Sequence, residues 1–238
     1  MTKTQTLAEA FEEICVMDAP LNQRLAAYSD KLRELHFPFA EAYDDLKGRL
    51  LAGEVGTMAP AIGEPMPSFI LPAKSGRLVS LEDVIAKGPA VISFNRGHWC
   101  PLCKIELRTI ANHHAELSAL GAEVVSIMPD RQKFAATLGA DTLGSLQILS
   151  DIDNAYALSL GLVIWLGDKI QDLMRGRGLH LDTYQGNEGW FVPVPATFVV
   201  GTDGRVAGRL VDPDITKRMD VDEILCALRV AREQARAE

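Results

Sequence analysis

Two cysteines three positions apart, Cys100 and Cys103, are the residues whose type and spacing point most directly to chemistry. The apolar, largely β-branched residues 91–94 precede them, and apolar residues recur at helical spacing after them. The pair is therefore expected where a buried strand turns into a helix. A helix N-terminus carries unpaired N–H groups and the positive end of the helix dipole, which stabilise a thiolate. One sulfur is expected to be nucleophilic, and the other can attack a mixed disulfide that the first has formed.

The side chains around the pair each have an expected role and a plainer alternative. Arg96 and Lys104 can add positive charge near the sulfurs, although Lys104, like Glu106, also fits an ordinary surface charge. Trp99 is expected either to shield the dithiol from water or simply to pack. His98 is expected either to assist proton transfer near neutral pH or to be solvated.

The same cysteine pair also fits half of a zinc site, a structural disulfide, or two buried apolar residues that do not react. A zinc site needs further ligands, and the sequence offers no second pair at metal-ligand spacing, since His113 and His114 are adjacent on a predicted helix. The expected chemistry requires neither a metal nor an organic cofactor. Cys15 and Cys226 lie on apolar stripes of predicted helices and are expected to be small core residues.

The composition is that of an ordinary globular protein, with 47% hydrophobic and 24% charged residues in a chain of 238. The net charge of -8 and the lack of a Lys/Arg block argue against a nucleic-acid partner. No apolar segment is long enough to span a bilayer, and residues 1–14 lack the apolar core of a secretory signal. A cytoplasmic protein without membrane contact is therefore expected, and in that reducing compartment a close cysteine pair points to redox chemistry.

Helices are predicted for residues 4–52, where Thr6 and Glu9 form a capping box and apolar residues recur at helical spacing. Residues 53–63 form a linker by their glycine and proline content. We therefore divide the chain into a helical extension with its linker, residues 1–61, and a main domain, residues 62–238. The apolar stripes of the extension are expected to pack on the main domain or to form a homodimer.

Strands and helices alternate after residue 62, which predicts a parallel sheet covered on both faces. The buried strand 192–200 contains Pro195, which makes this residue a candidate for a cis peptide bond. Asp203-Gly204 predicts a hairpin to a strand that ends at Val211. Residues 162–192 look like an insertion with a helix at 168–175. After the last strand, turn or cap roles, with interface contacts as an alternative, are expected for Asp212, Asp214 and Arg218.

Five segments in this order carry a resemblance to a known family: 63–69 (GEPMPSF), 94–107 (FNRGHWCPLCKIEL), 121–128 (GAEVVSIM), 151–154 (DIDN), and 195–200 (PATFVV) with Asp203-Gly204. The chain resembles the thioredoxin-fold superfamily, and within it the peroxiredoxin-like branch of the alkyl hydroperoxide reductase and thiol-specific antioxidant family. The resemblance covers about residues 62–230. It implies an α/β fold of the thioredoxin-like kind, with a central mixed β-sheet flanked by helices, to which the N-terminal helical extension is added.

Two patterns in that superfamily assign different roles to the two sulfurs. Peroxiredoxins place the peroxide-attacking cysteine at the end of Pro-x-x-x-Thr/Ser-x-x-Cys, which corresponds here to Cys103. Cys100 then stands at the Thr/Ser position and Arg96 at the proline. Peroxiredoxins also supply an arginine before a later strand, where this sequence has Pro195. By this resemblance Arg96 is the residue that can replace the missing charge.

The thioredoxin pattern instead makes Cys100 the exposed nucleophile and Cys103 the buried resolving cysteine. Pro195 then corresponds to the cis-proline that lies opposite the pair, and Val194 offers backbone hydrogen bonds to the partner. Because Cys100 is nearer to the unpaired N–H groups, the geometry expected for a strand, turn and helix favours it as the nucleophile.

The dithiol and the resemblance together predict a thiol-dependent oxidoreductase that cycles between dithiol and disulfide. Its expected substrates are hydrogen peroxide or alkyl hydroperoxides, or alternatively the disulfides of protein partners. A thioredoxin-like or glutathione-type electron donor then returns the pair to its reduced state. A different class of function also fits, namely a redox-responsive interaction protein whose disulfide changes partner affinity without turnover.

Overall fold

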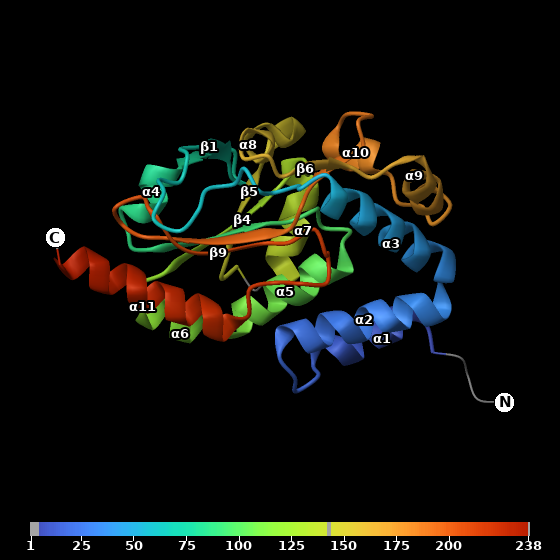
Figure 1. Ribbon diagram of the computed structural model, residues 1–238, viewed down its shortest axis with the longest axis horizontal. Coiled ribbons are helices and arrows are strands. Elements are labelled where there is room, and N and C mark those ends of the chain that lie inside the picture. Colours follow the sequence, from blue (N-terminus) through green and yellow to red (C-terminus); the bar gives the residue numbers. More distant parts are fainter. Residues whose placement is uncertain (1–4, 142–143, 238) are drawn as a thin grey trace.

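A five-stranded mixed sheet forms the centre of the chain in the computed structural model, which describes residues 5–141 and 144–237 (Figure 1). The strand order is β5-β4-β3-β8-β9, with β3 in the middle. β3 is parallel to β4 and β4 to β5, whereas β8 is antiparallel to both β3 and β9. The strands are β3 (Ala90–Phe94), β4 (Glu123–Met128), β5 (Gln147–Ser150), β8 (Ala196–Val200) and β9 (Val206–Val211).

The expected α/β fold with a central mixed sheet is confirmed, and the connections explain the mixture of strand directions. Helices connect β3 to β4 and β4 to β5, which leaves these strands parallel. The Asp203-Gly204 turn reverses the chain between β8 and β9, as expected of a hairpin. Gly204 has a φ of +77°, a conformation that glycine adopts without steric cost. The predicted parallel arrangement therefore holds for β3 to β5, and the predicted hairpin accounts for the antiparallel pair β8 and β9.

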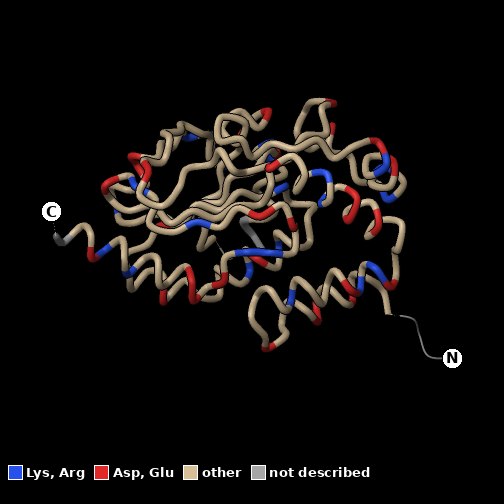
Figure 2. The backbone as a smooth tube through the Cα atoms, in the orientation of Figure 1, with Lys and Arg blue, Asp and Glu red and all other residues tan. Residues whose placement is uncertain are grey.

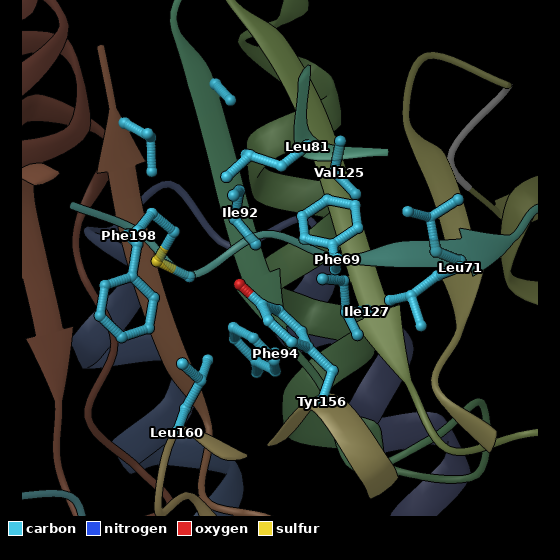
Figure 3. Packing of buried hydrophobic residues seen from close by; sticks show 14 of the residues in the cluster. Phe69, Leu71, Leu81, Ile92, Phe94, Val125, Ile127, Tyr156, Leu160 and Phe198 are labelled. Carbon is cyan, nitrogen blue, oxygen red and sulfur yellow. The ribbon is translucent and has the colours of Figure 1, made fainter. Parts of the chain in front are cut away.

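One face of the sheet is covered by an apolar layer (Figure 3). Ile92 and Phe94 of β3 lie in this layer together, because side chains two positions apart share a face of a strand. The rings of Phe94 and Tyr156 stack with their centroids 5.7 Å apart. The covering elements are β1 (Ile70–Pro72), β2 (Leu78–Ser80), α4 (Leu81–Ile85) and α8 (Ala155–Ser159), and a 3₁₀ turn (Ile152–Asn154) leads into α8.

Four helices cover the opposite face of the sheet. Val91 of β3 packs in a second apolar cluster with Leu107 and Ile224. Ser93 lies on this face as well, and its hydroxyl donates to the Glu106 carboxylate. The helices are α5 (Pro101–Asn112), α6 (His114–Ala119), α7 (Gln132–Asp141) and α11 (Val221–Ala237).

The predicted N-terminal helices are confirmed as α1 (Leu7–Cys15), α2 (Leu21–Leu35) and α3 (Phe37–Ala52). Thr6 and Glu9 form the predicted capping box at the start of α1. Of the two packing alternatives, the structure shows packing on the same chain: α1 and α2 contact α5, and α3 contacts α9. Figure 1 shows α1 and α2 beside α5, on the side of the sheet that α5 and α11 cover.

Residues 162–192 hold more regular structure than predicted. The helix expected at 168–175 is confirmed as α9 (Asp168–Arg175). β6 (Val163–Trp165) and β7 (Phe191–Pro193) pair as a small antiparallel sheet, with α10 (Leu181–Gln185) between them in sequence. The predicted strand 192–200 is therefore divided, because β7 joins β6 and β8 joins β3.

Pro195 lies in the interruption between β7 and β8, and its expected cis peptide bond is absent. The described ranges contain no cis peptide bond. A trans bond before proline is lower in energy by about 0.5–1 kcal/mol. The chain also passes from β7 to β8 without a tight turn that a cis bond would serve. Proline has no N–H for a strand ladder, which fits its place between two sheets.

Acidic and basic residues are interspersed along the helices and loops instead of gathering by sign on one element (Figure 2). Within the described ranges, no helix combines the length and the apolar character needed to cross a membrane.

Candidate active site

Cys100 and Cys103 lie at the predicted junction between strand and helix. Cys100 is the N-cap of α5, and Pro101 occupies the first helical turn, where its missing N–H is not needed. The backbone N–H of Cys103 donates to the Sγ of Cys100 at 3.3 Å. A sulfur thus takes the place that a Ser, Thr or Asp oxygen has at most helix N-termini, and a thiolate is the better acceptor there.

The two sulfur atoms are close together and fully buried. Their Sγ atoms are 2.7 Å apart, with the Cys103 thiol donating to Cys100. A disulfide bond of about 2.05 Å therefore needs only a small movement of either side chain. Both residues are 0% exposed.

Arg96 supplies positive charge directly at Cys100. The side chain is 2% exposed, and its Nη2 donates to the Sγ of Cys100 at 3.2 Å. The guanidinium lies between two aromatic rings, 5.2 Å from the centroid of Tyr43 and 5.5 Å from that of Trp99. Among the described residues, its Nε and Nη1 have no hydrogen-bond partner. Trp99 therefore packs against the charged group beside the thiol.

The surroundings shift the pKa values of the two thiols in opposite directions. Burial raises the pKa of Cys100, but the hydrogen bond from Cys103 and the charge of Arg96 outweigh it, so this pKa lies well below its ordinary value. Burial and the neighbouring Cys100 sulfur hold the pKa of Cys103 well above its ordinary value. The pair therefore favours a thiolate at Cys100 and a thiol at Cys103.

A buried ion pair lies between the dithiol helix and the sheet, and the sequence analysis placed neither of its residues there. Glu106, predicted at the surface, and Arg218, predicted as a turn or cap residue, are each 1% exposed. The Nε of Arg218 donates to Glu106 Oε2 at 2.7 Å, and Ser93 donates to Oε1 at 2.9 Å. Burial raises the pKa of Glu106, while Arg218 opposes this shift. The prediction for Glu106 was wrong because α5 presents this face to the sheet and not to solvent. Arg218 lies in the predicted connection before α11, but its side chain is buried against Glu106.

Helical spacing contained a signal for Glu106. It lies three positions after Cys103 and four before Ile110, so all three share one face of α5. A carboxylate on a face with a buried thiol and a buried isoleucine indicates burial. Nothing local in the sequence identified Arg218 as its partner, because the two residues are 112 positions apart.

The N-terminal helices cover the dithiol. Leu21, Leu25 and Tyr28 of α2 belong to the same apolar cluster as Cys100 and Cys103. The thioredoxin pattern predicted an exposed nucleophile at Cys100, and this was wrong because α2 shields that sulfur. Two polar contacts fix α2 in place: Asn22 exchanges hydrogen bonds of 2.9 Å with the backbone of Arg218, and Arg24 donates to Thr109 of α5 at 2.6 Å.

A cavity of about 130 Å³ lies beside the dithiol and is bounded on that side by Arg96. Arg96, Trp99 and Pro101 form its wall next to the dithiol. The other walls come from α1, α2 and α3, and from the segment that follows α9. A small molecule in this cavity contacts the guanidinium that is hydrogen-bonded to Cys100.

His98 is held by a carboxylate and is not solvated. Its Nδ1 lies 2.7 Å from Oδ2 of the buried Asp130, and its backbone N–H donates to the same oxygen. The imidazole also contacts the rings of Phe134 and Tyr184. The solvated alternative for His98 is therefore wrong.

Val194 and Pro195 are both buried. The N–H of Val194 donates to the Leu162 carbonyl at 2.7 Å and is therefore already used. The backbone hydrogen bond to a partner that the thioredoxin pattern predicts would have to be made by the Val194 carbonyl. Of the other two cysteines, Cys15 is buried as predicted, whereas Cys226 is exposed. Cys226 lies on the side of α11 away from the buried Ile224 and Leu228.

Comparisons with known proteins agree with this geometry. The model of the AhpC/TSA family matches residues 62–209. Thiol-disulfide oxidoreductase ResA from Bacillus subtilis (strain 168) is 24% identical over 157 residues, which cover 66% of this chain and 70% of that protein. The crystal structure of Peroxidoxin BcpB from Mycobacterium tuberculosis matches with a TM-score of 0.55 at 22% identity, over 71% of this chain and 97% of that chain. The crystal structure of Enterococcus faecalis AhpC matches with a TM-score of 0.55 at 19% identity, and the match covers 74% of this chain and 95% of that chain.

At these identities the structural matches show a shared fold. The family match goes further, because it spans more than half of the chain and includes both Cys100 and Cys103. Helices α1 to α3 lie outside the matched segment. On this evidence the chain belongs to the AhpC/TSA family, as its sequence resemblance indicated.

Proposed function

We propose that this thiol-dependent oxidoreductase reduces hydroperoxides, with Cys100 as the attacking thiolate and Cys103 as the resolving thiol. One observation carries the choice of substrate: both sulfurs are 0% exposed, and a cavity of about 130 Å³ lies against the arginine that contacts Cys100. A small peroxide fits into such a space. A disulfide on another protein needs a sulfur at the surface.

In the first step the Cys100 thiolate attacks the terminal oxygen of the peroxide. A sulfur–oxygen bond forms and the oxygen–oxygen bond breaks, which leaves a sulfenic acid on Cys100 and an alkoxide. The alkoxide takes the proton of the Cys103 thiol and departs as the alcohol. Arg96 supports this step because it stabilises the thiolate, and because the N–H groups of its Nε and Nη1 are free to donate to the peroxide oxygens.

In the second step the Cys103 thiolate attacks the Cys100 sulfur. The disulfide forms, the sulfur–oxygen bond breaks, and the departing hydroxide takes a proton from solvent to leave as water. Two electrons have then passed from the sulfurs to the peroxide. A thioredoxin-like or glutathione-type donor then returns two electrons to the disulfide, and this step requires α1 and α2 to move away from Cys100 so that the donor thiol can reach it.

The division of the chain belongs to this proposal. Residues 1–61 act as a cover that keeps bulk water from the thiolate, and residues 62–238 carry the chemistry. The cytoplasmic location expected from the sequence is part of the same proposal, since a reducing compartment keeps the pair ready to react.

Protein disulfide reduction is the second candidate, favoured by the likeness to thiol-disulfide oxidoreductase ResA. For that activity α1 and α2 must move away from Cys100, because they cover it.

Stopped-flow oxidation of the reduced chain by hydrogen peroxide and by cumene hydroperoxide, followed through tryptophan fluorescence, separates the two candidates. Our proposal predicts oxidation far faster than that of free cysteine and slow reduction of insulin disulfides. Cys100→Ser removes the reaction, whereas Cys103→Ser keeps the first step and loses the disulfide. Peroxide oxidation no faster than that of free cysteine, with rapid insulin reduction, would transfer the assignment to disulfide exchange.

A further inference from the structure

The cavity beside Arg96 has an apolar interior that the peroxide chemistry itself does not require. Its apolar lining comes from Leu7 of α1, Tyr28 and Leu32 of α2, Phe39 of α3, Leu179 after α9, and Ile215 before α11. Hydrogen peroxide has no apolar surface to bury against such walls. An apolar group binds there favourably, because its surface is removed from water.

Most of the apolar lining comes from the N-terminal helices. Leu7, Tyr28, Leu32 and Phe39 belong to the N-terminal helices, outside residues 62–209 that match the family model. Leu179 lies in the segment that follows α9. The dithiol is carried by the family fold, whereas most of the apolar wall is supplied by a part of the chain that lies outside the family match.

Two arginines line the cavity. Arg177 is exposed and lies over the Phe39 ring, whereas the buried polar end is formed by Arg96. This side chain is 2% exposed and lines the cavity, and its Nε and Nη1 have no partner within the described ranges. A buried N–H without an acceptor costs about 1–3 kcal/mol. A ligand with oxygen atoms at one end would supply those acceptors and place the oxygens next to Cys100 Sγ, to which Arg96 already donates.

The size of the cavity limits the apolar end. A volume of about 130 Å³ is close to that of a dry, apolar protein cavity of about 150 Å³ that binds benzene. One ring or a compact branched chain fits this space, and an extended lipid chain does not. The tyrosine and phenylalanine in the wall favour an aromatic ring through edge-to-face contacts.

We propose that this cavity is a subsite for the tail of an organic hydroperoxide that bears one aromatic ring or a compact branched alkyl group. The hydroperoxide end meets Arg96 and Cys100, and the tail lies among Leu32, Phe39 and Leu179. The N-terminal helices thereby select the substrate as well as cover the dithiol. This inference rests on the proposed function and adds the substrate class to it.

The first test compares hydroperoxides on the reduced, full-length chain by stopped flow, with each rate divided by that of free cysteine. Cumene hydroperoxide is expected to react about 10- to 100-fold faster than hydrogen peroxide, as burial of one ring allows. A long-chain fatty acid hydroperoxide is expected to lose that advantage. Equal normalised rates for all three would overturn the subsite and leave the proposed function intact. Slow reaction with all three would instead defeat the proposed function.

The second test fills the cavity. Leu32→Phe is expected to lower the rate with cumene hydroperoxide about 10-fold or more and to leave the rate with hydrogen peroxide within about two-fold. Leu35→Phe, in the same helix and outside the cavity lining, is the matched control and is expected to change neither rate. Leu179→Phe approaches the same space from the opposite wall and serves if Leu32→Phe does not fold. Equal losses with both peroxides would contradict the subsite.

A binding measurement supplies a readout without turnover. The product alcohol 2-phenyl-2-propanol is expected to bind the reduced wild-type chain in ligand-observed NMR and to lose that binding in Leu32→Phe but not in Leu35→Phe. Absence of binding to the wild-type chain would overturn the proposal, whatever the rates of peroxide reduction.

Discussion

Two buried arginines lie near the sulfur pair, and their surroundings differ. On the sheet side, Arg218 is paired with Glu106 and also donates to the carbonyls of Ile215 and Lys217, so that among the described residues only its Nη2 lacks a partner. On the cavity side, Arg96 donates to the Cys100 sulfur, and two of its nitrogens lack a partner in the part of the chain that the structure describes.

The contrast indicates different roles for the two charges. A buried arginine that is paired with a carboxylate is compensated within the fold, so its loss is felt as instability. A buried arginine whose donors remain unused is held ready for groups that arrive later, at a cost to stability. We therefore assign Arg218 to the support of the site and Arg96 to its chemistry.

Arg218→Met is expected to have the largest effect and to act on stability. It leaves the Glu106 carboxylate buried without its partner, which typically costs about 3–5 kcal/mol in the free energy of unfolding. Urea denaturation measures this loss. The double variant Glu106→Gln/Arg218→Met removes both charges and is expected to recover most of it. A single variant as stable as the wild-type chain would contradict the role assigned to Arg218.

Arg96→Met is expected to act on reactivity instead. The loss of one preorganised donor at a reacting centre lowers rates by about 100-fold or more, so peroxide oxidation of Cys100 should slow by that order at neutral pH. Stopped flow measures the rate, and urea denaturation of the same variant is the control, with little change expected. A large loss of stability together with an unchanged rate would mean that Arg96 supports the fold and does not contribute to the chemistry.

The pH dependence of the Cys100 thiolate tests whether Arg96 lowers the pKa of this sulfur. The pKa of Cys100 is lowered in the fold, so the thiolate persists as the pH falls below about 8.5, the ordinary value for a thiol. Its contribution to stability is therefore complete above that value and is lost as the pH falls through the lowered pKa. Absorbance at 240 nm follows the thiolate. Arg96→Met is expected to move the transition to higher pH, and an unmoved transition would remove Arg96 as its cause.

Tyr43→Leu is expected to have the smallest effect. The ring of Tyr43 lies against the Arg96 guanidinium, and such a contact contributes about 0.5–2 kcal/mol, so the rate should fall by about 2- to 30-fold. Tyr43→Phe keeps the ring and is expected to keep most of the rate. If both variants lose activity equally, the phenol and not the ring is responsible.

The sequence predicted the elements that local patterns specify. The capping box at Thr6, helix α9 and the hairpin at Asp203-Gly204 follow from neighbouring residues, and the structure confirms all three. The dithiol at the start of α5 follows from the strand before it and the helical spacing after it.

The parts that the sequence did not reveal depend on contacts between distant segments. The Glu106–Arg218 pair joins residues 112 positions apart, and the burial of Cys100 comes from α2, about 75 positions earlier in the chain. Pro195 was expected to be cis by analogy with thioredoxins, but the chain has room for the trans bond where it passes between two sheets.

Which sulfur attacks is the central claim, and trapping of the sulfenic acid tests it most directly. Each single-cysteine variant, Cys100→Ser and Cys103→Ser, is exposed briefly to cumene hydroperoxide in the presence of dimedone and then mapped by mass spectrometry. We predict a dimedone adduct on Cys100 in the Cys103→Ser variant and little on Cys103 in the Cys100→Ser variant. A rapid adduct on Cys103 in the Cys100→Ser variant, with none on Cys100 in the other, would contradict the account.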